Sequence, residues 1–61
     1  MLTSKQANVM AALIRQAVID SDTSWLETAR QYLHQVTNDE QDIDLFVFWI
    51  EQTREHIQRA A

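Results

Sequence analysis

The chain contains no glycine, no proline and no cysteine among its 61 residues. Average protein composition would supply about seven glycines and prolines together in a chain of this length. Glycine closes most tight β-hairpin turns, so its absence argues against a sheet built from hairpins. The absence of cysteine excludes disulfide bonds. We therefore predict an all-α fold whose helices are separated by Asp, Asn, Ser and Thr residues.

The first predicted helix spans residues 3–20. Thr3 and Gln6 have the spacing of a capping box, in which two side chains satisfy free backbone N–H groups at the start of a helix. Ile19 falls on the polar side, where it is either exposed or part of a contact. The remaining apolar residues recur at helical spacing and predict one buried stripe: Val9, Met10, Leu13, Ile14, Ala17 and Val18.

The second predicted helix spans residues 23–36. Ser24 and Glu27 form another possible capping box, although Asp22 could cap this helix instead. Its apolar positions make a narrow stripe, which is typical of a helix with one covered face. The stripe consists of Trp25, Leu26, Ala29, Tyr32, Leu33 and Val36.

The third predicted helix spans residues 39–59 and carries two competing capping boxes, Thr37 with Glu40 and Asn38 with Gln41. Its first turns contain four acidic residues. These residues complement the positive end of the helix dipole, or they form a docking patch for a basic partner. These acidic residues are Asp39, Glu40, Asp42 and Asp44, and the predicted core stripe is Ile43, Phe46, Val47, Ile50, Ile57 and Ala60.

Residues 45–50 are six consecutive apolar residues, three of them aromatic. On a helical wheel they cover roughly 260°, whereas a one-sided surface helix needs about 100°. A strand is the alternative for this run, but no second β-rich run exists to pair with it and both flanks favour a helix. We therefore predict a contact surface formed by Leu45, Phe48 and Trp49, with His56 at its rim. Protonation of His56 would weaken an association that buried this rim.

A chain of 61 residues makes one domain at most, and domains this small usually need a disulfide, a metal or a partner chain. We predict a single three-helix domain over residues 1–61 that forms a homodimeric bundle, with the third helix, alone or together with the first, packed across a two-fold axis. The extra apolar face of the third helix would serve this dimer or a complex with another protein.

No catalytic, cofactor-binding or metal-binding residues are predicted. His34 and His56 lie on different helices, and no motif pairs either histidine with a glutamate at metal-binding spacing. The segment from Asp20 to Ser24 resembles the start of a calcium loop, but it lacks the required glycine, and Gln31 stands where a bidentate glutamate is needed. A three-helix chain of this size also offers little concavity for acid–base catalysis by paired carboxylates. We expect a protein that is not an enzyme.

The net charge of −4 disfavours binding to phosphate backbones and to anionic membranes. The alternative function is a transcription-linked, DNA-associated module, because the second and third helices could form a helix-turn-helix. Its turn lacks glycine, its second helix opens with carboxylates, and Arg54, His56 and Arg59 make only a small basic cluster. No run approaches the ~18 apolar residues of a membrane span, and we expect no signal peptide, because Arg15 ends the first apolar stretch early. We expect a cytoplasmic protein.

Two segments, MLTSKQANVMAALIRQAV and DIDLFVFWIEQTREHIQRAA, together cover most of the chain. In size and helical texture they resemble the small all-helical proteins encoded in the exo–xis region of lambdoid bacteriophages. The resemblance implies an accessory protein made early in phage development in the host cytoplasm. Such proteins influence the lysis–lysogeny choice and host physiology without a known enzymatic activity. The resemblance assigns no site residues.

Overall fold

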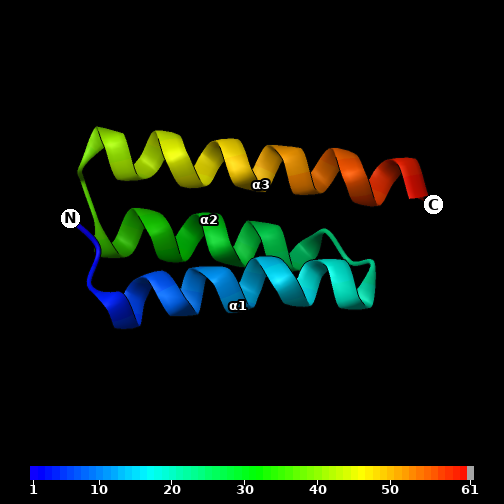
Figure 1. Ribbon diagram of the computed structural model, residues 1–61, viewed down its shortest axis with the longest axis horizontal. Helices are drawn as coiled ribbons and strands as arrows, with labels where there is room; N and C mark the ends of the chain where they lie inside the picture. Colours follow the sequence, from blue (N-terminus) through cyan, green and yellow to red (C-terminus); the bar gives the residue numbers. More distant parts are fainter. Residues whose placement is uncertain (61) are drawn as a thin grey trace.

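The structure is a computed structural model that describes residues 1–60. They form three helices, α1 (Ser4–Asp20), α2 (Ser24–Val36) and α3 (Glu40–Ala60), and no strand occurs within this range (Figure 1). Each helix begins and ends within one residue of its predicted bounds. The prediction of an all-α chain with three helices is therefore confirmed, and the strand alternative for residues 45–50 is wrong.

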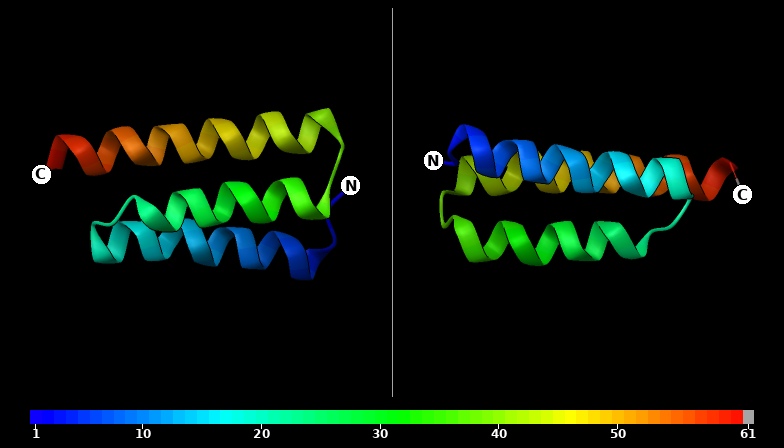
Figure 2. Two further views of the ribbon diagram at one scale, coloured as in Figure 1. Left: turned by 180° about the vertical axis from the view of Figure 1, so that it is seen from behind. Right: turned by 90° about the horizontal axis from the view of Figure 1, so that it is seen from below.

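The helices form an up-down-up bundle. α1 and α2 are antiparallel, α2 and α3 are antiparallel, and α1 therefore runs parallel to α3 (Figure 1). Seen from below, α1 overlaps α3 while α2 lies to one side, so the three axes form a triangle and not a flat layer (Figure 2). The bundle measures 34 × 18 × 15 Å, and the last turns of α3 project beyond the turn that joins α1 to α2.

The core lies along the line where the three helices meet. Each helix contributes residues at spacings of three and four, as expected for a helix that buries one stripe. α1 and α2 pack against each other more extensively than either packs against α3. The buried apolar residues are Met10, Ile14, Ala17, Leu26, Ala29, Leu33, Phe46, Ile50 and Ile57.

Two positions of the predicted stripes are exposed in the structure, and one position outside them is buried. Val18 is 43% exposed, because it lies 100° around the helix from Ala17, which already faces the other helices. Ala60 is exposed because it lies in the part of α3 that projects past its neighbours. Conversely, Thr53 is buried between Ile50 and Ile57, where its position on the stripe outweighs its hydroxyl group.

The capping box at the start of α1 is confirmed. The N–H of Gln6 donates to Thr3 Oγ1 at 3.1 Å, and the N–H of Thr3 donates to Gln6 Oε1 at 3.0 Å. At the other end of α1, Ser21 adopts the left-handed conformation, with φ 49° and ψ 44°. Glycine usually occupies this C-cap position. Here a serine adopts the left-handed conformation, although its Cβ makes that conformation less favourable.

The capping box predicted for α2 is wrong. Thr23 precedes the helix without a side-chain capping bond, and Asp22 Oδ1 accepts the N–H of Ser24 at 2.9 Å. The Ser24 hydroxyl and backbone N–H together hold the pKa of Asp22 below its ordinary value of 3.8. A carboxylate is a stronger acceptor than a serine hydroxyl, so the alternative cap at Asp22 prevails.

Neither of the boxes predicted for α3 forms. Instead Asp39 Oδ1 accepts the N–H of Gln41 at 2.9 Å, and Thr37 Oγ1 accepts the N–H of Asp39 at 3.1 Å. Asp39 is thus the cap, again because its carboxylate competes successfully with neutral acceptors.

Asp42 connects three parts of the chain. Its Oδ2 accepts the backbone N–H of Leu2 at 3.0 Å and the hydroxyl of Thr37 at 3.4 Å, and it lies 3.6 Å from the amino group of Met1. Asp39 lies 3.7 Å from the same amino group. Two of the four acidic residues near the start of α3 therefore stabilise the fold.

Candidate protein-interaction surface

Three large apolar side chains of α3 remain exposed on two successive turns. Leu45 and Phe48 are each 64% exposed, and Trp49 is 42% exposed. We call these three residues the α3 outer surface. They are three of the four residues that the sequence predicts as a contact surface.

The exposure of this surface follows from the geometry of a three-helix bundle. α1 and α2 cover the side of α3 that carries Phe46 and Ile50, and both of these residues are buried. Phe48 is two residues from each of them and so points about 200° away around the helix axis. With only two neighbouring helices, α3 has no element in residues 1–60 that could cover its third side.

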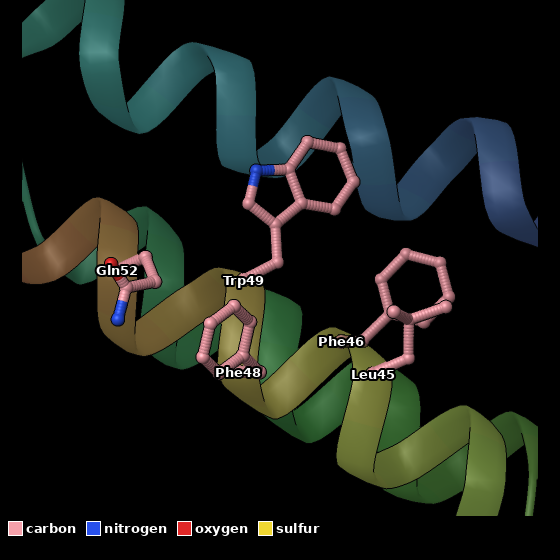
Figure 3. Close-up of a pocket in the computed structure, with 5 residues that line it drawn as sticks. All are labelled: Leu45, Phe46, Phe48, Trp49 and Gln52. Atoms are coloured by element: carbon pink, nitrogen blue, oxygen red, sulfur yellow. The ribbon is translucent and has the colours of Figure 1, made fainter.

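The surface is hollowed. A depression of about 360 Å³ is lined by Leu45, Phe46, Phe48, Trp49 and Gln52, and Gln52 is its only polar lining residue. Figure 3 shows these five side chains projecting from α3, with the indole of Trp49 directed toward α1. The depression has the size and apolar lining to hold one large apolar side chain.

One residue of the core, Phe46, also lines this depression. Phe46 is buried and stacks against Trp49, with ring centroids 5.9 Å apart and an interplanar angle of 30°. Stacking of this kind adds to the stability that apolar burial gives and restricts the rotamers of both rings. The sequence did not predict Phe46 and Gln52 as lining residues. Gln52 follows Leu45 by seven residues and Phe48 by four, so its position on the helical wheel could have placed it here.

His56 is exposed but does not line the apolar depression. It lies one turn further along α3, in a second depression of about 300 Å³ that is lined by Gln52, Glu55, His56 and Arg59. Gln52 borders both depressions. His56 therefore lies next to the α3 outer surface, and Gln52 separates it from the apolar depression.

Two arginines form ion pairs between α2 and α3. Arg54 pairs with Glu27 on α2, and its Nε lies 3.7 Å from Glu51. Arg30 on α2 pairs with the same Glu51. These pairs connect α2 to α3 on a different side of α3 from the α3 outer surface.

The pair between Glu55 and Arg59, predicted from their spacing on one face of the helix, is confirmed. The basic cluster suggested by Arg54, His56 and Arg59 is thus largely neutralised by carboxylates. α3 also begins with acidic residues, where a recognition helix needs donors for bases and phosphates. The described residues give the DNA-associated alternative no support.

Within residues 1–60, no three His, Cys, Asp or Glu side chains come close enough to hold a metal ion. The lowered pKa of Asp22 is explained by its role as a helix cap. None of the helices in this range combines the length and the apolarity needed to cross a membrane. No protein-family model, curated protein or solved structure matches the chain.

Proposed function

We propose that this protein is a non-enzymatic accessory protein that acts by protein–protein contact through the α3 outer surface. The observation that carries the proposal is the joint exposure of Leu45, Phe48 and Trp49 around one apolar depression. Apolar residues scattered singly over a surface are ordinary, whereas a contiguous group of large ones marks an interaction site.

The chemistry of the surface supports this proposal. Aromatic side chains dominate the energetic centres of protein interfaces, because they bury a large area with few rotatable bonds. The α3 outer surface offers two aromatic residues and a leucine on a helix that the core already holds in place. Trp49 would lose little conformational entropy on binding, since Phe46 already stacks against its ring.

The biological setting is part of the same proposal. The likeness in size and helical texture to exo–xis proteins of lambdoid phages supports a regulatory role in phage development, in the host cytoplasm. Burial of the α3 outer surface, in a homodimer or against a host or phage protein, would be the molecular event. We propose no cofactor and no metal for this activity.

A comparison of two exposed apolar residues tests the proposal. Wild type, Phe48→Ala and Ile19→Ala are immobilised separately, and each is exposed to a cell lysate that also contains an untagged copy of this chain. Ile19 is a suitable control because it is 67% exposed but lies on α1, outside the depression. We expect wild type and Ile19→Ala to retain the same proteins and Phe48→Ala to lose at least one of them.

Identical retention by all three proteins would contradict the proposal. A mixed-sequence DNA duplex, added at low salt, tests the alternative function with the same immobilised proteins. Retention of this duplex that does not depend on Phe48 would favour a DNA-associated role instead.

A further inference from the structure

We infer that a second copy of this chain covers the α3 outer surface, with its own α3 lying antiparallel across a two-fold axis near Phe48. This inference rests on the proposed function and names the partner of that same site. It is carried by three properties of α3: the spacing of its uncovered residues, the area they offer, and the distribution of charge along the helix.

The first property is spacing. The uncovered side of α3 continues along the whole helix as a strip in which exposed residues alternate at intervals of four and three. Two helices can pack lengthwise along such a strip, and its two apolar members, Leu45 and Phe48, occupy consecutive positions of the repeat. Because α3 has 21 residues, the strip is about 30 Å long. We call it the α3 outer strip: Gln41, Leu45, Phe48, Gln52, Glu55 and Arg59.

The second property is area. The exposed parts of Leu45, Phe48 and Trp49 amount to roughly 300–400 Å² of apolar surface, whereas each partner in a standard interface contributes about 800 Å². The polar ends of the α3 outer strip must therefore be covered as well. A long helix does this, and with the axis near Phe48 the α3 of a second copy lies along residues 40–56 of the first.

A two-fold axis also fits the position of the apolar residues. An isologous contact uses each residue twice, so apolar residues near the axis meet their own counterparts. With the axis near Phe48, the apolar middles of both strips come together at the centre of the interface, and the polar ends form its rim. This arrangement is the usual anatomy of a protein interface.

The third property, charge, selects the orientation. The first half of α3 contains Glu40, Asp42 and Asp44 and no basic residue. In the second half, two arginines balance Glu51 and Glu55, and His56 adds a further basic group. A parallel pair would place two sets of carboxylates side by side. An antiparallel pair places the carboxylates of each copy beside the second, nearly neutral half of the other α3. It also orients the two helix dipoles in opposite directions, which is favourable.

The test uses cross-linking in a chain that has no cysteine of its own. Gln41→Cys and His56→Cys are made separately, and both positions are exposed on α3, so far-UV circular dichroism should match wild type. Each is treated with a short bismaleimide, alone and as an equal mixture. Since the two positions lie at similar distances on either side of Phe48, antiparallel pairing places the thiol introduced at position 41 of one copy beside the thiol introduced at position 56 of the other. We expect a covalent dimer in the mixture and little in either variant alone.

Light scattering over a dilution series measures the association itself. We expect a concentration-dependent dimer, and we expect Phe48→Ala to weaken it about tenfold or more, as the loss of a central aromatic does in other interfaces. Ile19→Ala should leave the dimer unchanged.

Two results would overturn the inference. Cross-links of each variant with itself would show a parallel pair. A monomer at every concentration, with no cross-link in the mixture, would exclude a second copy. The proposed function would survive the second result if immobilised wild type retained another protein in a manner that depends on Phe48.

Discussion

The two faces of α3 carry similar side chains but lie in different environments. Ile50 on the inner face is fully buried, while Phe48, two residues earlier, is mostly exposed. Apolar character by itself does not explain this difference. α1 and α2 cover the inner face, and nothing in residues 1–60 covers the outer face. α3 therefore carries more apolar surface than the bundle buries.

We expect the two faces of α3 to have separate roles, the inner face in folding and the outer face in association. The inner face stabilises the monomer, because its residues lose their contact with water when the bundle forms. In the proposed function, the outer face contributes to a complex, and its exposure leaves it little part in folding. Substitutions on the two faces should therefore change different measured quantities.

The largest expected effect on stability comes from the inner face. Ile50→Ala removes a fully buried side chain and leaves a cavity, so we expect the free energy of unfolding to fall by about 2–5 kcal/mol. Phe48→Ala should change it by no more than about 0.5 kcal/mol at concentrations where the protein is monomeric. Urea denaturation followed by circular dichroism measures both. Equal losses for the two variants would show that the outer face also stabilises the monomer.

A smaller effect distinguishes two acidic residues of α3. Asp42→Ala removes the acceptor of the Leu2 N–H and of the Thr37 hydroxyl, and we expect it to cost about 1–2 kcal/mol. Asp44 is exposed, so Asp44→Ala should stay within about 0.5 kcal/mol of wild type. The same denaturation experiment compares them. An unchanged free energy of unfolding in Asp42→Ala would show that the contacts of Asp42 with Leu2 and Thr37 do not stabilise the fold.

Two arginines of α3 should also contribute unequally to stability. Arg54 pairs with α2, and its side chain is 29% exposed, while Arg59 pairs within the outer strip and is 78% exposed. We expect Arg54→Ala to destabilise the fold by about 0.5–1 kcal/mol and Arg59→Ala by about 0.3 kcal/mol. Double-mutant cycles with Glu27 and Glu55 isolate each pair. A larger coupling at Glu55 and Arg59 would reverse the expected order.

The smallest effect concerns the cap of α2 and depends on pH. Because the pKa of Asp22 is lowered in the folded chain, its capping contributes fully above the ordinary value of 3.8. The contribution is lost as the pH falls through the lowered pKa. We expect Asp22→Ala to melt at a lower temperature than wild type at neutral pH, and this gap to close in acid. An NMR titration of the Asp22 carboxyl with a midpoint at or above 3.8 would contradict this account.

Local signals in the sequence predict much of this fold. The helix bounds agree within one residue because helical periodicity and break residues act over only a few positions. The capping box of Thr3 and Gln6 is equally local and is confirmed. The exposed residues Leu45, Phe48 and Trp49 were predictable for the same reason, since an oversized apolar arc can be read from a helical wheel.

Other features depend on residues that are far apart in the chain. The contact between Leu2 and Asp42 spans 40 positions, and the pair between Glu27 and Arg54 spans 27. No periodicity within one helix predicts which polar groups meet across two helices. The caps at Asp22 and Asp39, by contrast, are local contacts in which a carboxylate prevailed over neutral acceptors.

The three helices and the apolar excess on the third follow from the sequence alone, because both arise from the spacing of residues along one helix. The same spacing already placed Ile50 in the core and Phe48 on the surface, whereas the burial of Thr53 beside Ile50 emerged only from the packing of the three helices. The position of α1 and α2 buried Ile50 and Thr53 and left Phe48 exposed. The physical reason is that burial depends on neighbouring elements, and a bundle of three helices can cover only part of the circumference of each.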